Sequence, residues 1–131
     1  MIKIDDWVIK KGEKAQGKIE IVGRGMAMPA TVICGAEDGP TILITAGIHS
    51  AEYVGIQAAM ELAKEFQPEE LKGNVIIIPL VNVSGFEHRT MSMVYEDGKN
   101  LNRVFPGNSE GTAAECIACT IVRKLFSITD Y

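Results

Sequence analysis

Thr41-Ile-Leu-Ile-Thr-Ala46 and Asn74-Val-Ile-Ile-Ile-Pro-Leu-Val81 are the two apolar runs that decide the fold of this chain. Each has the length of a strand, and the second is so continuously apolar that it fits a strand covered on both faces. Between them, apolar residues recur every three or four positions from 52 to 66, which predicts an amphipathic helix. A strand, a helix and a second strand at these lengths predict a right-handed parallel unit, so the expected fold class is α/β.

The residues before this unit predict further strands. Residues 1–30 place short apolar stretches between glycines and lysines, and Lys18-Ile-Glu-Ile-Val22 alternates with a period of two. This pattern is typical of an N-terminal β-hairpin or an edge strand. Thr31-Val-Ile-Cys34 is another short strand candidate, and the Asp-Gly-Pro sequence within 35–40 favours a turn between it and the strand at 41–46.

The residues after the unit predict a long loop and a second helix. Residues 82–111 show almost no periodicity, and a loop of this length inside a compact domain is usually functional. Thr112-Ala-Ala-Glu115 matches a capping box, and apolar residues follow at intervals of four, which predicts a helix that runs to Phe126. With 131 residues, the chain is long enough for one domain with a core and too short for two, so residues 1–131 are expected to form a single domain.

Composition and charge exclude several classes of protein. The chain is 47% hydrophobic and 23% charged, which places it among folded globular proteins rather than disordered ones. Thirteen basic and seventeen acidic residues give a formal net charge of -4, so no basic surface that would attract a nucleic acid is expected. No apolar run approaches the roughly 20 residues of a membrane helix, and the N-terminus lacks the apolar region of a signal peptide. We therefore expect a soluble, cytoplasmic chain whose partners include neither a nucleic acid nor a membrane.

His49 and Glu52 form the sharpest motif, because they lie where the first apolar strand ends and the helix begins. In α/β sheets, ligands bind in the crevice at the carboxyl ends of the strands. A turn at this junction could direct an imidazole and a carboxylate to one point, and these two residue types are two-thirds of the His2Glu set of catalytic zinc sites. The alternative is that Glu52 only favours the positive end of its helix while His49 is an ordinary loop residue.

The long loop contains a second polar motif, Asp97-Gly-Lys-Asn-Leu-Asn-Arg-Val-Phe-Pro-Gly107. Arg103 offers a planar set of donors that fits a carboxylate through two parallel hydrogen bonds, and the neighbouring amide of Asn102 would complete an anion site. A solvent-exposed turn rich in glycine and asparagine is the alternative interpretation.

The two motifs, in this order, resemble one known family. Gly39-Pro-Thr-Ile-Leu-Ile-Thr-Ala-Gly-Ile-His-Ser-Ala-Glu52 and the motif at 97–107 are similar to segments of the succinylglutamate desuccinylase/aspartoacylase family, whose members are relatives of the zinc carboxypeptidases. The resemblance runs from about residue 30 to the end of the chain. The joint occurrence of both motifs makes it specific.

The resemblance implies a role for five residues. The histidine and the glutamate of the first motif bind one zinc ion in that family, which implies His49 and Glu52 as zinc ligands here. The Asn-Arg pair of the second motif binds the substrate carboxylate, which implies Asn102 and Arg103. An upstream arginine of the same loop polarises the scissile carbonyl and stabilises the oxyanion, and Arg89 is the residue that best matches it.

The resemblance also implies a fold and a length. Members share a three-layer, zinc-carboxypeptidase-like fold of the phosphorylase/hydrolase-like type, with a mixed, mainly parallel sheet flanked by helices. They carry a second zinc histidine on a strand after the second helix, and a catalytic glutamate further along. Here Ile128-Thr-Asp-Tyr131 resembles the start of that strand, so the chain is expected to be a truncated, N-terminal portion of the catalytic domain, with residues 1–30 as its N-terminal β segment. The third zinc ligand and the general base are expected beyond residue 131.

A few other residues have alternative interpretations. His88 is the only other histidine, and it is either a substitute zinc ligand or a surface or substrate-facing side chain. Cys116 and Cys119 have the spacing of a redox pair, but their small apolar neighbours favour packing, and three cysteines with no disulfide-like spacing favour reduced thiols. Gly23-Arg-Gly25 lacks the third glycine of a dinucleotide-binding motif. Ser50 stands where many relatives have glycine, which leaves the spacing of the first motif unchanged.

The function that follows from the resemblance is that of a zinc-dependent hydrolase, a deacylase that cleaves the acyl amide bond of an N-acyl amino acid or a similar carboxylated small molecule. The 131-residue chain is expected to be inactive alone, because it has two zinc ligands and no general base. The alternative is a non-catalytic metal-binding or assembly domain. A strand edge left open at the end of the chain would also permit self-association into a homo-oligomer.

Overall fold

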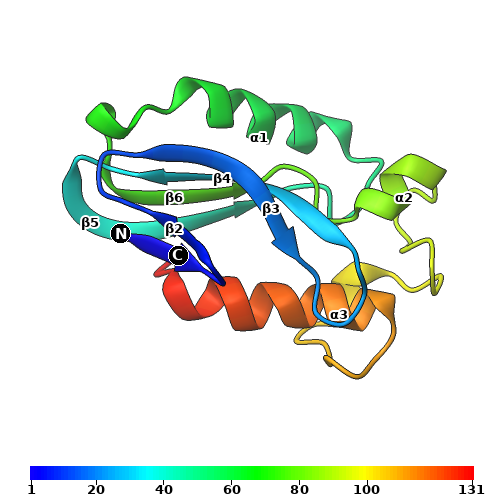
Figure 1. The fold of residues 1–131 in the computed structure, drawn as a ribbon. Coiled ribbons are helices and arrows are strands. Elements are labelled where there is room, and N and C mark those ends of the chain that lie inside the picture. The colour runs from blue at the N-terminus through cyan, green and yellow to red at the C-terminus, as the bar shows by residue number, and fades with distance from the viewer.

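The computed structural model describes all residues, 1–131. Its strands are β1 (Ile2–Ile4), β2 (Trp7–Ile9), β3 (Lys14–Glu20), β4 (Ala27–Cys34), β5 (Glu37–Thr45) and β6 (Lys72–Ile78). Its helices are α1 (Tyr53–Glu65), α2 (Val83–His88) and α3 (Ala113–Thr120), with 3₁₀ turns at Pro68–Glu70, Leu101–Arg103 and Phe126–Ile128 and a π-helical turn at Ile121–Leu125. These elements form three layers, because α1 lies along one face of the central sheet and α3 along the other (Figure 1). None of the helices is long and apolar enough to cross a membrane.

The main sheet has four strands in the order β3-β4-β6-β5. β5 and β6 are parallel and are joined through α1, so the predicted strand-helix-strand unit is confirmed. β3 pairs with β4, and β4 with β6, in the antiparallel direction. The sheet is therefore mixed, as expected. Its expected mainly parallel character is limited in this chain to the β5-β6 pair, because β3 and β4 follow one another through a short connection that reverses the chain.

The first thirty residues form strands, as predicted. β1 and β2 make an antiparallel hairpin in which Ile2 lies opposite Ile9. β3 is an edge strand of the main sheet, so the hairpin and the edge strand offered as alternatives are both present. The hairpin packs closely on β3, since a Cβ at Gly17 would lie 3.1 Å from the ring of Trp7.

The predicted turn at residues 35–40 is shorter than expected. β4 ends at Cys34 and β5 already begins at Glu37, so the Asp-Gly-Pro sequence lies inside a strand. The pairing of β5 with β6 is irregular between Glu37 and Thr41. Because β5 is at the edge of the sheet, it tolerates both this irregularity and Pro40, which has no N–H to donate.

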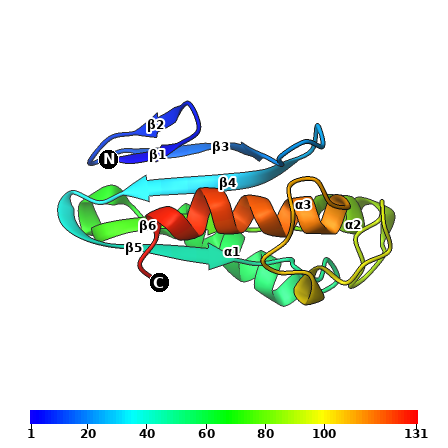
Figure 2. The same ribbon diagram turned by 90° about the horizontal axis from the view of Figure 1, so that it is seen from below.

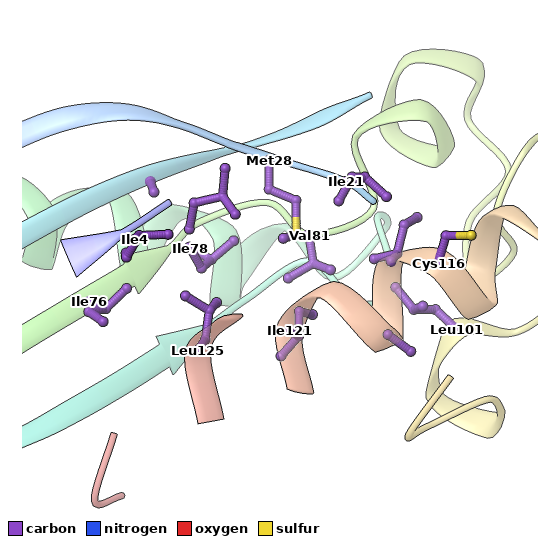
Figure 3. Packing of buried hydrophobic residues seen from close by; sticks show 14 of the residues in the cluster. Ile4, Ile21, Met28, Ile76, Ile78, Val81, Leu101, Cys116, Ile121 and Leu125 are labelled. Carbon is purple, nitrogen blue, oxygen red and sulfur yellow. The ribbon is translucent and has the colours of Figure 1, made fainter. Parts of the chain in front are cut away.

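The face of the sheet toward α3 holds the larger core (Figure 3). Met28 of β4 and Ile76 and Ile78 of β6 lie opposite Ile121 and Leu125 of the helix that continues from α3. All five side chains are at most 1% exposed. Since burying one such side chain contributes about 1.5–3 kcal/mol, this core is the main source of stability.

The face of the sheet toward α1 holds a smaller core. Ile33 of β4 and Val75 and Ile77 of β6 pack there with Ala59 and Ala63 of α1. Successive side chains of β6 therefore enter opposite cores. This confirms the prediction that the most apolar strand is covered on both faces.

α3 begins at the predicted capping box. The backbone N–H and the hydroxyl of Thr112 donate to Oε2 of Glu115 over 2.8 and 2.9 Å. These two hydrogen bonds, followed by the interaction with Lys99 at 3.3 Å, hold the pKa of Glu115 below its ordinary value. The helical backbone continues through the π-helical and 3₁₀ turns to Ile128, so the prediction of a helix over 112–126 is confirmed.

The last residues of the chain lie beside β5 (Figure 2). The N–H of Asp130 donates to the carbonyl oxygen of Thr41, and the N–H of Leu43 donates to the carbonyl oxygen of Tyr131, each over 2.8 Å. The carboxylate of Asp130 also accepts the N–H of Thr41. Residue numbers increase together along the two segments, as in a parallel pair. These bonds support the resemblance of residues 128–131 to the beginning of a strand.

We expect Glu115→Gln to lower the Tm near neutral pH, because a neutral amide accepts the Thr112 hydrogen bonds less strongly than a carboxylate does. A carboxyl group whose pKa is lowered by folding stabilises the fold fully at pH values above its pKa in the unfolded chain, 4.5. This contribution is lost as the pH falls through the pKa of the folded state. The difference in Tm between the two proteins should therefore be largest above about pH 5 and vanish in stronger acid. Thermal unfolding at a series of pH values measures it, with Glu110→Gln as the control. A difference that stays constant into acid would contradict this account.

Candidate functional site

The candidate site lies where β5 and β6 end at the same edge of the sheet. The carbonyl oxygen of Ala46 accepts the N–H of Val81 over 3.0 Å, and that of Gly47 accepts the N–H of Asn82 over 2.9 Å. Gly47 has a φ of 65°, and a Cβ there would lie 2.7 Å from Cδ1 of Leu80, so the position requires glycine. These contacts hold the turn after β5 beside the segment that leaves β6.

His49 and Glu52 come together in the turn between β5 and α1. Nδ1 of the His49 imidazole lies 3.1 Å from Oε1 of the Glu52 carboxylate. Glu52 is the residue immediately before α1, and its side chain makes no capping hydrogen bond to that helix. The imidazole is 24% exposed and the carboxylate 67% exposed. The carboxylate is thus directed to the imidazole rather than to the first N–H groups of the helix.

The second ring nitrogen of His49 contacts the other motif. Nε2 lies 2.9 Å from Oδ1 of Asn100, in the loop that begins at Asp97. The hydrogen bond with Asn100, followed by the one with Glu52, raises the pKa of His49, while partial burial and the charge of Arg103 oppose the shift. The structure therefore joins the two sequence motifs through a single imidazole ring.

The 97–107 loop is held against the N-terminus of α3. Oδ2 of Asp97 accepts the N–H of Ala114 over 2.8 Å, and Oδ1 accepts the N–H of Lys99 over 2.9 Å. A carboxylate is favourable at this end of a helix, because the first N–H groups carry partial positive charge. Leu101 is completely buried in the core beneath α3. The loop is therefore an anchored segment and not a purely solvent-exposed turn.

Asn102 and Arg103 lie on an exposed 3₁₀ turn that Asn100 begins. Oδ1 of Asn100 accepts the N–H of Asn102 over 3.0 Å. Nη1 of Arg103 donates to the carbonyl oxygen of Asn102 over 3.1 Å. The other guanidinium donors face solvent, where they could form two parallel hydrogen bonds to a carboxylate.

Arg89 lies beside the turn of the first motif. It ends α2 in the left-handed conformation, with φ of 56°, and Met91 is also left-handed with φ of 61°. Oγ of Ser50 donates to the carbonyl oxygen of Met91 over 2.9 Å, and the N–H of Ala51 donates to the same oxygen over 3.3 Å. These four residues line one small cavity of about 30 Å³. Left-handed backbone at two bulky residues is costly, and it is typical of segments that position functional groups.

The donor set of His49 and Glu52 fits zinc in chemistry and in spacing. Imidazole nitrogen and carboxylate oxygen bind zinc at about 2.0–2.2 Å. Two such ligands on a tetrahedral ion lie about 3.3 Å apart, which is close to the 3.1 Å between Nδ1 and Oε1. No group of three or more His, Cys, Asp or Glu side chains is arranged to hold a metal ion. The pair is therefore one protein ligand short of the usual catalytic zinc site.

His88 belongs to a different cavity. Its Nδ1 lies 2.9 Å from the carbonyl oxygen of Ser84, and its ring stacks on Tyr95 with a centroid distance of 3.6 Å. The cavity that it lines measures about 210 Å³ and lies between β4, α2 and α3. The structure does not bring His88 into the cluster of His49 and Glu52.

The cysteines pack in the interior. All three are free and buried. Sγ of Cys116 contacts the carbonyl oxygens of Asn108, Ser109 and Gly111 and accepts a hydrogen bond from Nε of Arg24 over 3.4 Å. The Gly-Arg-Gly sequence around Arg24 lies in the connection from β3 to β4 and precedes no helix.

Sequence reasoning missed two residues of the site and one helix. Asn100 lies within the second motif. Asparagine side chains commonly accept the backbone N–H two residues further along in turns, so the contact of Asn100 with the N–H of Asn102 could have been predicted. Its contact with His49 depends on packing that no local pattern reports. Ser50 was noted only as a departure from glycine. α2 is capped by Asn82, whose Oδ1 accepts the N–H of Gly85 over 3.1 Å, and its six residues are too few to show periodicity.

Comparison with known proteins shows a family match over most of the chain. Residues 38–130 match the succinylglutamate desuccinylase/aspartoacylase catalytic domain. A curated relative, N-alpha-acetyl-L-2,4-diaminobutyric acid deacetylase of Halomonas elongata, is 39% identical over 124 residues. The aligned part covers 93% of this chain and 33% of that protein, so the chain spans about a third of the length of this relative.

Solved structures resemble the whole fold. An aspartoacylase family protein of Mesorhizobium loti has a TM-score of 0.81 and 34% identity, over 89% of this chain and 38% of that chain. The product-bound ectoine utilization protein EutE (DoeB) of Ruegeria pomeroyi has a TM-score of 0.81 and 31% identity, over 98% of this chain and 40% of that chain. The expected α/β fold with helices on both faces of a mixed sheet is thus confirmed.

We expect Gly47→Ala to destabilise the fold more than Gly12→Ala does. Both glycines have positive φ, at 65° and 79°, and an alanine in this conformation costs about 1–2 kcal/mol. At Gly47 the added Cβ also meets Leu80, whereas nothing lies within 4 Å at Gly12. Crowding of this kind adds about 1–3 kcal/mol. Urea unfolding of the two variants measures the difference, and equal losses of stability would contradict the assigned contact.

Proposed function

Since the chain belongs to the succinylglutamate desuccinylase/aspartoacylase family, we propose that it carries part of the active site of a zinc-dependent hydrolase. The proposed enzyme is a deacylase that cleaves the acyl amide bond of an N-acyl amino acid or a similar carboxylated substrate. One observation carries this proposal. Nδ1 of the His49 imidazole contacts Glu52, and Nε2 contacts Asn100, which belongs to the loop of Asn102 and Arg103.

In this proposal, His49 and Glu52 hold the metal through Nδ1 and a carboxylate oxygen. When bound, zinc supplies a Lewis acid for a carbonyl oxygen and lowers the pKa of a bound water. Support comes from the donor types, from their separation of 3.1 Å, and from the exposure of the carboxylate to solvent. The expectation of a third ligand and a general base beyond residue 131 stays a prediction.

The substrate would be oriented by the two arginines. Arg103 and Asn102 would bind its carboxylate, because their side chains are exposed next to the loop that contacts His49. Arg89 would donate to the oxygen of the scissile carbonyl and stabilise the negative charge that develops on it. The bond between Ser50 and Met91 supports this role, since it connects the segment of Arg89 to the turn of the first motif.

The names of the relatives support the substrate class. One relative is a deacetylase of N-alpha-acetyl-L-2,4-diaminobutyric acid, which is an N-acyl amino acid. Such a molecule has a carboxylate for Arg103 and Asn102 and an acyl carbonyl for Arg89. We therefore propose a small-molecule partner. A cytoplasmic location and a homo-oligomeric state stay predictions.

A non-catalytic metal-binding or assembly domain is the second candidate function. His49 and Glu52 could bind a metal without catalysis, as in such a domain. An apolar groove of about 400 Å³ beside the outer edge of β5 also favours assembly, and Leu43, Phe105, Ile121 and Phe126 are among the residues that line it. Zinc content and hydrolysis, measured on the 131-residue chain and on a chain extended past Tyr131, separate the two candidates.

We expect His49→Ala and Glu52→Ala each to lower the zinc affinity of the chain by more than about tenfold, because each removes one of two ligands. His88→Ala is the matched control and should bind zinc as the unmodified chain does. Competition with a chromophoric chelator measures the affinities. Undiminished zinc binding by both ligand variants would remove these residues from the metal site.

The 131-residue chain should show no zinc-dependent deacylation, because a two-ligand site without a general base cannot activate water efficiently. Release of free amine from N-acetyl amino acids by the zinc-loaded chain measures this. The Halomonas elongata relative provides a positive control. Chelator-sensitive hydrolysis in proportion to bound zinc would show instead that these residues suffice.

A further inference from the structure

We propose that Asn100 is a positioning residue of the metal site, whose amide oxygen keeps a proton on Nε2 of His49 and so leaves Nδ1, the nitrogen beside Glu52, to bind the metal. The same oxygen orders the turn of Asn102 and Arg103. The proposal rests on the proposed function, because it assigns the metal to His49 and Glu52.

The orientation of the Asn100 amide follows from its backbone contact. The side-chain atom of Asn100 that lies 2.9 Å from Nε2 of His49 also lies 3.0 Å from the backbone nitrogen of Asn102. A backbone N–H can only donate. The shared atom must therefore be the amide oxygen, since an NH₂ group at that position would face a second donor.

The tautomer of His49 follows from the orientation of the amide. An amide oxygen only accepts hydrogen bonds, so Nε2 of His49 must be the donor of the contact with Asn100. In the neutral imidazole, a proton on Nε2 leaves the lone pair on Nδ1. Nδ1 lies 3.1 Å from Oε1 of Glu52, and a carboxylate also only accepts, so Nδ1 carries a proton as well until a metal takes the place of that proton. The hydrogen bond to Asn100 thus selects the nitrogen that can bind a metal.

Asn100 is well placed for this role because it is anchored on both sides. Next to it, Leu101 is completely buried, and Asp97 of the same loop binds the N-terminus of α3. Asn100 itself is half-buried, whereas Glu52 is largely exposed. The firmly held partner of the imidazole is therefore Asn100. Partners of this kind commonly change metal affinity about 10–100-fold when they are removed.

Asn108 and His88 are matched references for Asn100 and His49, respectively. Asn108 accepts the N–H of Glu110 over 3.0 Å, the same two-residue turn that Asn100 makes, but it has no contact with His49. His88 places Nδ1 2.9 Å from the carbonyl oxygen of Ser84, which only accepts, so its proton must be on Nδ1. Once zinc replaces the Nδ1 proton of His49, the only two histidines of the chain should therefore carry their ring protons on opposite nitrogens.

The test is a titration of the ¹⁵N-labelled chain with Zn²⁺, followed by two-bond ¹H–¹⁵N correlation spectra of the imidazole rings. The proteins compared are the unmodified chain, Asn100→Ala, Asn100→Asp and Asn108→Ala. Asn100→Asp keeps an oxygen acceptor, and the Nδ1–H signal of His88 reports in each variant that the fold around α2 is intact.

In the unmodified chain, zinc should shift Nδ1 of His49 to the range of a metal-bound nitrogen while Nε2 keeps its proton. Asn100→Ala should lower the zinc affinity at least about tenfold and make the Nε2 proton exchange rapidly with solvent. Asn100→Asp should stay within a few-fold of the unmodified chain, and Asn108→Ala should match it.

Two outcomes would overturn the proposal while leaving the metal assignment intact. One is zinc bound through Nε2 of His49, and the other is a loss of zinc affinity in Asn100→Ala that is smaller than about tenfold. Zinc that leaves the His49 signals of the unmodified chain unchanged would overturn the metal assignment itself, and this proposal with it.

Discussion

Parallel pairing of β5 with β6 is the constraint on which the rest of the structure depends. Parallel strands end at the same edge of a sheet, and here the backbone continues the pairing beyond both strands through the bonds of Ala46 with Val81 and Gly47 with Asn82. The turn that carries His49 and the segment that leads into α2 are therefore held side by side. β6 sends side chains into both cores, so the position of this edge is fixed by a strand that is buried on both faces.

The site is a contact between two loops, and each loop is anchored on a different layer. The loop of His49 continues β5, while the loop of Asn100 is attached to α3 through Asp97 and through the buried Leu101. Each layer supplies one set of the proposed functional groups, the proposed metal ligands from the sheet and the proposed substrate-binding residues from the α3 side. Their relative position depends on how α3 packs on the sheet, which the larger core determines.

The outer edge of β5 pairs with the last residues of the chain over part of its length. Asp130 and Tyr131 pair with β5 only at Thr41 and Leu43, and an apolar groove lies next to them. An open edge with an apolar neighbour is a surface on which a further strand can pair. Ile48 lines this groove, so whatever pairs there would come close to His49 and Glu52, the proposed metal ligands.

Much of the fold could be predicted from local patterns, because those patterns report burial and capping. The continuous apolar run at 74–81 predicted a strand covered on both faces, and the Thr112-Ala-Ala-Glu115 sequence predicted the start of α3. The Asp-Gly-Pro sequence was misleading, because turn preference is a local property and the edge position of β5 is a property of the whole sheet.

By itself, the sequence determined the α/β class, the strand-helix-strand unit and the two polar motifs, since each is encoded within a few neighbouring residues. The tertiary structure alone decided that Asn100 contacts His49 and that Ser50 contacts Met91. The reason is physical. A hydrogen bond between side chains 51 residues apart requires two loops to be placed to within a few tenths of an ångström, and only the packing of α3 on the sheet provides that placement.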